Sequence, residues 1–186
     1  MEYVEPIKEI ELIKRIKTVL KEKSKRDYVL FVFGINTGIL ISHLLQIKVK
    51  DVYDGQSIKD YYLLQEAKNV EEKLFYINQK VKEALLSYIK EARLQQEDFL
   101  FKSRKNDQPI TRQQAYRIIN TVAREVGMRE KIGTHTLRKT FGYHAYCGGV
   151  AIYLLQAIFN HSTKAETLRY IGIDKKNVKV KIDVNL

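Results

Sequence analysis

Hydrophobic residues near the N-terminus recur at helical spacing. The series comprises Ile7, Ile10, Ile13, Ile16 and Leu20, and lysine and glutamate fill most of the positions between them. This pattern predicts an amphipathic helix with one buried face. Ser24 is a good N-cap for a second helix, whose nearly continuous apolar character indicates burial on most sides, and Gly38 breaks it. Residues 41–47 predict a short third helix.

The pattern then changes to short β-rich segments. They span residues 48–53, 59–68 and 73–77, with turn signals at Asp54-Gly55 and at residues 69–71. We therefore expect a small antiparallel sheet of three strands. Lys68 should end the second strand, beside the turn.

Two further helices carry N-cap signals. Asn78 opens one of them, and a capping box formed by Thr111 and Gln114 opens the other. Their apolar stripes comprise Val81, Leu85, Tyr88 and Ile89 in the first helix and Ala115, Ile118, Ile119, Val122 and Val126 in the second. The predicted fold class is accordingly α+β, mainly α-helical.

The helix after Thr111 has two interpretations. Arg112, Gln113 and Arg117 would suit base or phosphate contacts if it is the recognition helix of a helix-turn-helix. We favour the other interpretation, a core helix with a basic, solvated face. The loop before this helix, residues 97–110, is expected to expose Lys102, Arg104 and Lys105.

Composition narrows the class of partner. The chain carries a formal net charge of +11 and an isoelectric point near 9.6, so its field should attract nucleic acid or an anionic membrane surface. The longest apolar run, Tyr28–Ile35, is far shorter than the ~20 residues of a membrane span. The acidic N-terminus also lacks the pattern of a secretory signal. We therefore expect a cytoplasmic protein with no membrane association. The lone Cys147, within an apolar helical run, should be a buried and inert thiol.

A length of 186 residues fits one domain. We assign residues 1–173 to this domain and residues 174–186 to a C-terminal tail. Alternate positions of the tail are apolar: Val178, Val180, Ile182, Val184 and Leu186. The alternation predicts a strand, which needs a partner because a lone strand is not stable.

The stretch from Thr134 to Tyr170 holds residues suited to phosphoryl transfer. His135 and Arg138 are three apart and share one helix face, and a capping box of Thr163 and Glu166 starts a short helix with Tyr170 near its end, where the phenol can reach outward. Because a free tyrosine has a pKa of about 10, its attack on a phosphodiester needs a nearby base or cationic field. The transition state also needs donors that neutralise its charge. The sequence shows no acidic cluster suited to two-metal catalysis and no P-loop, so we expect neither a metal ion nor a cofactor.

The pattern H-x-L-R-K-T-F-G, followed by N-H-S-T and T-L-R-Y-I, resembles the tyrosine recombinase (phage integrase) family, over about residues 7–173. The resemblance implies the fold of the family's catalytic domain. It also implies site-specific DNA recombination. Tyr170 would attack the scissile phosphate, form a 3′-phosphotyrosyl link and free a 5′-hydroxyl, and the hydroxyl of a second strand would reverse this chemistry without ATP or metal.

The resemblance also implies a role for each of several residues of this chain. Arg138 corresponds to an arginine that clamps the phosphate, and His161 to a histidine that hydrogen-bonds it. Lys68 corresponds to the lysine that protonates the leaving oxygen, and we favour it over Lys73. His135, at a helix start, should stay neutral and serve as a base. Asn160 replaces a family glycine and tolerates the left-handed conformation of a helix end. Candidate DNA contacts are Lys102, Arg104, Lys105, Arg112, Arg117 and Lys139.

Positions 40 and 43 depart from the family pattern. T-G-L-R-x-S-E-L in the family aligns with residues 37–44, so Leu40 replaces a phosphate-clamping arginine and His43 replaces the acidic residue that supports it. Losing one such donor typically costs ~10²–10³ in rate. Two hypotheses follow: a recombinase with reduced activity, or a DNA-binding relative that acts as a regulator or accessory factor.

The resemblance also implies partners. They are double-stranded DNA and further copies of the chain, assembled on DNA through the C-terminal tail, with docking of the tail on its own sheet as the competing arrangement. Family members usually carry an N-terminal helical domain that closes over the DNA. Here the resemblance occupies nearly the whole chain and leaves no residues for that domain, so we expect either a naturally short relative or an excised fragment.

Overall fold

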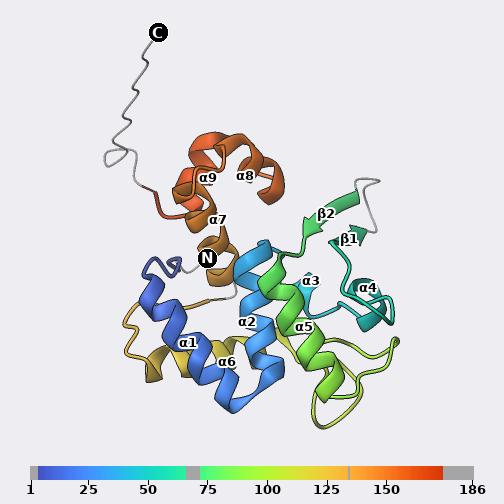
Figure 1. Ribbon diagram of the computed structural model, residues 1–186. Helices are drawn as coiled ribbons and strands as arrows, with labels where there is room; N and C mark the ends of the chain where they lie inside the picture. Colours follow the sequence, from blue (N-terminus) through green and yellow to red (C-terminus); the bar gives the residue numbers. More distant parts are fainter. Residues whose placement is uncertain (1–3, 66–71, 134, 174–186) are drawn as a thin grey trace.

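Helix α2 (Lys25–Thr37) forms the centre of the domain. The computed structural model describes residues 4–65, 72–133 and 135–173. In it, α1 (Ile10–Lys23), α5 (Gln79–Glu91), α6 (Arg112–Glu125) and α7 (Thr136–Cys147) all pack against α2, as Figure 1 shows. This arrangement confirms a mainly helical fold with a small antiparallel sheet. No helix within the described ranges is long and apolar enough to cross a membrane.

The local signals for α2 are confirmed, and they explain how it positions α7. The Ser24 hydroxyl accepts a hydrogen bond from the Asp27 amide at 3.4 Å, and Gly38 ends the helix at a φ of +70°. Gly34 leaves room for α7, because a Cβ at this position would lie 2.6 Å from Leu137 Cδ1. The two helices therefore approach closely enough to fix the start of α7.

Helix α1 begins later than its apolar stripe. Ile13, Ile16 and Leu20 are buried within the helix, whereas Ile10 at its first position is 52% exposed. Ile7 is buried but precedes the helix, since its amide donates to the Thr140 hydroxyl of α7 at 2.9 Å. This tertiary contact holds the residues before α1 against α7.

The expected three-stranded sheet is wrong in its first strand. Residues Val49–Val52 form the short helix α4, after α3 (Ile41–Leu44), because the Asp51 carboxylate accepts from the Lys48 amide at 2.8 Å while Val49 and Val52 are buried one turn apart. In the described residues the sheet has two antiparallel strands, β1 (Tyr61–Gln65) and β2 (Glu72–Tyr76). Lys68 and the tail lie outside the described residues.

The C-terminal part of the chain builds a second, smaller core. Helices α8 (Ile152–Phe159) and α9 (Lys164–Tyr170) pack together, and Leu155, Phe159 and Ile171 are buried there. In Figure 1 they lie at the end of α7 remote from α6. Cys147, the last residue of α7, is exposed, so the expected buried thiol is wrong. Helix α7 ends at Cys147, and the smaller core does not cover this thiol.

Candidate active site

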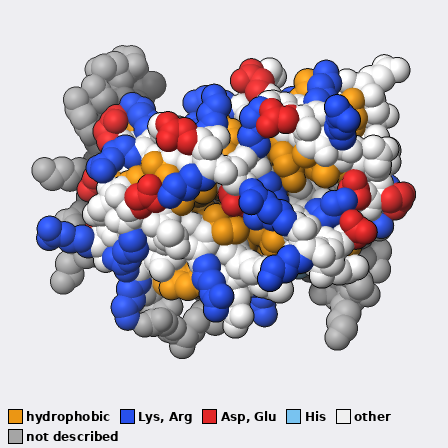
Figure 2. Space-filling view, turned by 90° about the horizontal axis from the view of Figure 1, so that it is seen from below, with side chains coloured by type: hydrophobic (Ala, Val, Ile, Leu, Met, Phe, Trp, Pro, Cys, Tyr) orange, Lys and Arg blue, Asp and Glu red, His pale blue; other side chains and the backbone are white. Residues whose placement is uncertain are grey.

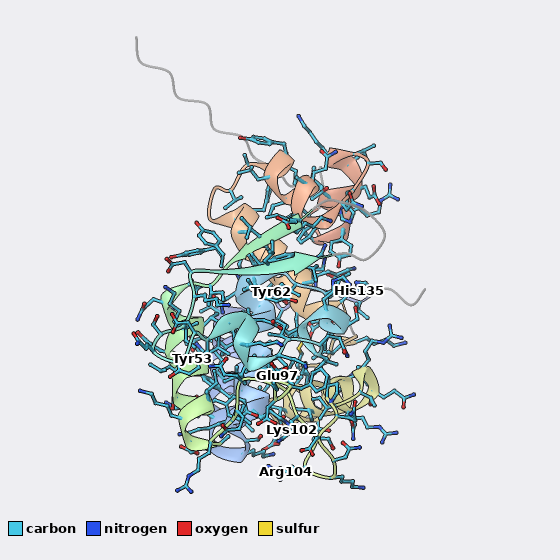
Figure 3. All side chains as sticks on the ribbon, turned by 90° about the vertical axis from the view of Figure 1, so that its right-hand side faces the viewer. Tyr53, Tyr62, Glu97, Lys102, Arg104 and His135 are labelled. Carbon is cyan, nitrogen blue, oxygen red and sulfur yellow. The ribbon has the colours of Figure 1, made fainter. Side chains whose placement is uncertain are left out.

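Three helix ends bring four predicted site residues together. His135 is the N-cap of α7 and Arg138 lies in its first turn, His161 follows the end of α8, and Tyr170 is the last residue of α9. Helix ends place side chains without disturbing a helix interior. The meeting point lies where the main and smaller cores join, and Figure 3 shows His135 there.

Tyr170 and His135 are in direct contact. The tyrosine hydroxyl lies 3.1 Å from His135 Nδ1, and the two rings meet edge to face. Burial lowers the pKa of His135, and the charges of Lys139 and Arg138 lower it further. The imidazole is therefore neutral at pH 7, as expected from the sequence. The largest cause is burial, whereas the expectation rested on the position of His135 at a helix start. With its proton on Nε2, it accepts the phenol's hydrogen bond through Nδ1.

Tyr170 points into the domain rather than outward, which corrects the expectation from the sequence. Its ring packs against Phe159 and His161, with centroid separations of 5.3 and 4.9 Å, and Lys139 Nζ lies 5.1 Å from the ring centre. Burial raises the pKa of Tyr170, while the charge of Arg138 and its hydrogen bond to Tyr170 act in the opposite direction. The phenol is thus protonated at neutral pH and needs a base.

Arg138 is held by the backbone. Its Nη1 donates to the carbonyl of Gly38 and its Nη2 donates to that of Ile158 at 3.0 Å, while the guanidinium carbon lies 4.7 Å from the ring centre of Phe159. The residue is only 8% exposed. Such anchoring fixes a permanent positive charge beside Tyr170.

The orientation of His161 is fixed by its backbone and by the hydroxyl of Thr167. Asn160 ends α8 in the left-handed region, at a φ of +58°, which confirms its expected role. The His161 amide donates to the Gln156 carbonyl at 3.0 Å, and Nδ1 lies 3.1 Å from Thr167 Oγ1. Burial lowers the pKa of His161, with Glu166 acting to raise it and Arg138 to lower it.

Thr167 is a site residue that the sequence interpretation did not single out. It is completely buried and stands three residues before Tyr170, so both lie on one face of α9. The spacing of three residues between Thr167 and Tyr170 was the signal in the sequence that could have identified Thr167. The same helix start corrects one detail of the capping box: Thr163 accepts from the Glu166 amide, but the Glu166 carboxylate accepts from the Ser162 amide.

Leu40 and His43, the positions that depart from the family pattern, follow shortly after Gly38, whose carbonyl anchors Arg138. Leu40 is the N-cap of α3 and is partly exposed, as is His43 in the same turn. Gly38, whose carbonyl holds Arg138, is two residues before Leu40. A side chain at position 40 is therefore close in sequence to the group that fixes Arg138.

The predicted DNA contacts divide into three groups. Arg104, Lys105, Arg112 and Arg117 are exposed, and Figure 2 shows many basic side chains, with acidic ones among them, on the face it displays. Lys102 is only partly exposed and pairs with Asp98 at 2.9 Å and with Asp107 at 3.2 Å, which corrects its expected exposure. A cleft of about 650 Å³ is lined by Arg26, Lys102, Arg104 and Lys105, among others. In Figure 3, Lys102 and Arg104 are labelled below His135, with Arg104 at the lower end of the domain.

Lys139 forms the third group. It is 6% exposed, and its Nζ donates to the Val4 carbonyl at 2.8 Å while facing the Tyr170 ring. Because its side chain is almost completely buried, Lys139 does not form part of the exposed basic surface, and a contact with DNA at this position stays a prediction. Within the described residues, no three histidine, cysteine, aspartate or glutamate side chains gather where they could hold a metal ion.

Comparisons with known proteins identify relatives that match most of the chain. A probable integrase/recombinase, YoeC, from Bacillus subtilis is 43% identical over 179 residues, covering 96% of this chain and 95% of its own length. A tyrosine recombinase, XerC, from Thermodesulfovibrio yellowstonii is 29% identical over 163 residues, covering 83% of this chain but 52% of the relative, so the chain spans about half of that protein.

Structural similarity supports the same fold. The crystal structure of a XerA recombinase superposes with a TM-score of 0.77 at 21% identity, over 95% of this chain and 62% of the recombinase. The sequence pattern described as the phage integrase family matches residues 7–177. Because this match covers nearly the whole chain and a relative matched over 95% of its own length is 43% identical, the chain belongs to the phage integrase family.

Proposed function

We propose that the protein cleaves and rejoins DNA at specific sites, with Tyr170 as the nucleophile. The observation that carries this proposal is the 3.1 Å contact between the Tyr170 hydroxyl and a neutral His135, next to the anchored charge of Arg138. A nucleophile, its base and a phosphate-binding cation thus meet at one place. The family and the name of the integrase/recombinase relative support DNA as the substrate.

The proposed reaction uses these groups in the following way. His135 Nδ1 takes the phenolic proton, the Tyr170 oxygen forms a bond to phosphorus, and the bond from phosphorus to the 5′-oxygen breaks. Lys68, which lies outside the described residues, is proposed to give the leaving oxygen its proton. The phosphotyrosyl bond stores the energy of the phosphodiester, so a 5′-hydroxyl of another strand can reverse the steps without an added energy source.

The cationic groups lower the barrier by stabilising the charged transition state. Arg138 is already fixed by two carbonyls and an aromatic ring, so its charge needs no rearrangement when negative charge develops. His161 adds a second phosphate contact. Arg104, Lys105, Arg112 and Arg117 are exposed and are proposed to contact the DNA backbone elsewhere.

A second candidate function is DNA binding without efficient cleavage. Leu40 and His43 favour it, because together they remove one phosphate-clamping cation and its supporting carboxylate. Typical losses for one such donor are ~10²–10³ in rate. The retained contact between Tyr170 and His135 favours the enzyme.

A nicked DNA substrate separates these functions. When the nick lets the cut fragment diffuse away, religation fails and the covalent protein–DNA adduct accumulates. We expect an adduct with the parent protein and its complete loss in Tyr170→Phe, since the phenylalanine has no attacking oxygen. Tyr143→Phe removes a hydroxyl from a neighbouring helix and should leave the adduct unchanged. DNA binding without any adduct, on substrates carrying the protein's own recombination site, would favour the regulator.

A further inference from the structure

The hydroxyl of Thr167 makes two contacts in the core of the site. Its Oγ1 lies 3.2 Å from the Thr163 carbonyl, one turn earlier in α9, and 3.1 Å from His161 Nδ1. The side chain is completely buried. No step of the proposed reaction uses this hydroxyl, so its pairing needs a separate explanation.

The chemistry of the two partners restricts where the protons lie. A carbonyl oxygen only accepts, so Thr167 must use its single proton on Thr163 if that contact is a hydrogen bond. The threonine oxygen then has only lone pairs to offer His161. Both contacts are hydrogen bonds at the same time only when His161 Nδ1 carries a proton and donates it to Thr167.

We propose that Thr167 is a positioning residue that holds neutral His161 with its proton on Nδ1 and a lone pair on Nε2. The consequence for catalysis, which rests on the proposed function, is that His161 can donate from Nε2 to a phosphate only as the charged imidazolium. A neutral ring would present a lone pair to the negatively charged oxygen and repel it.

The groups around His161 determine when the ring is charged. Arg138 of α7 and Glu166 of α9 face it with opposite charges, Tyr170 of α9 adds a phenol, and α8 contributes the Phe159 ring. Burial and Arg138 lower the pKa of His161, so its Nε2–H donor is lost as the pH rises through a value below the ordinary 6.5 in the DNA-free protein. A bound phosphate would raise that pKa. Adduct formation should therefore decline toward alkaline pH.

The position of the proton can be observed directly. Nitrogen-15 spectra of the imidazoles, recorded at about pH 8 where histidine is ordinarily neutral, distinguish a protonated ring nitrogen from a bare one. The chain has four histidines, and the signals missing in His161→Gln identify this one. We expect protonated Nδ1 and bare Nε2 in the parent and in Thr167→Ser, which keeps the hydroxyl.

Two valine variants complete this test. Thr167→Val removes the hydroxyl at nearly constant shape and should move proton density to Nε2. Thr140→Val is the matched control, because Thr140 is also buried and donates to a carbonyl one turn earlier, in α7, at 2.7 Å. It should leave the His161 signals unchanged. A parent protein with its proton on Nε2 would overturn the proposal, even if Thr167→Val fails to fold. A folded Thr167→Val protein whose spectrum matches that of the parent would also overturn the proposal.

Activity provides a separate readout. In Thr167→Val a neutral His161 can donate from Nε2, so the alkaline decline of adduct formation should become shallower, whereas Thr167→Ser should reproduce the parent profile. If no variant forms an adduct, the proposed function fails while the spectra still decide the tautomer. If adducts form and the three profiles have the same shape, the catalytic consequence is wrong.

Discussion

At the scale of single residues, Leu40 and His43 are expected to limit the proposed chemistry. They stand three apart at the start of α3, a spacing at which an arginine and a glutamate can pair. The double variant Leu40→Arg with His43→Glu should therefore raise adduct formation on nicked DNA, by up to about 10²–10³-fold. Leu40→Arg alone should gain less, because its charge lacks the supporting carboxylate. An equal yield of adduct from the double variant and the parent would contradict the alignment at position 40.

The residues of the site were predictable from sequence to different degrees. His135, Arg138, His161 and Tyr170 were found because their chemistry and order form a pattern, and the structure brings all four together. The inward direction of Tyr170 and the burial of Lys139 were not predictable. Both depend on how α8 and α9 pack onto α7, which no local spacing reports.

At the scale of helices, Gly142 determines how closely α9 approaches α7. A Cβ at this position would lie 2.6 Å from both Ile171 Cγ2 and Phe159 Cζ. Gly142→Ala should destabilise the protein by about 1–3 kcal/mol through overpacking. Helix propensity alone would stabilise it by about 1 kcal/mol, so the two effects have opposite signs. Urea unfolding measures the sum, and a raised midpoint would show that the helices separate without cost.

Helix starts were predicted well because a cap is a local interaction. Ser24, Asn78, Thr111 and Thr163 each accept a hydrogen bond from an amide three residues ahead, as their sequences indicated. The short helix α4 was mistaken for a strand. The buried Val49 and Val52 are three residues apart, which is helical spacing, but four residues are too few for this spacing to outweigh the β-branched residues of the segment. The Asp51 carboxylate, which accepts from the Lys48 amide, supports the helix.

At the scale of the whole molecule, the tail is proposed to join protomers. Its alternating apolar residues need a partner, and docking on another copy would couple Tyr170 to assembly. Light scattering should show association that increases with protein concentration and disappears when the chain is stopped at Lys176. If both forms remain monomers at high concentration, docking on the protein's own sheet is the remaining arrangement.

The contacts of α7 with distant segments of the chain also determine when the proposed active site can form. Ile7 binds this helix through Thr140 and His144, across 133 and 137 residues of sequence, while α9 closes its other side with Tyr170. Contacts between such distant segments form late, because the long intervening chain must be ordered first. A nascent chain that lacks α9 has no Tyr170 and therefore lacks the proposed nucleophile. The proposed cutting of DNA can therefore begin only after α9 has been synthesised.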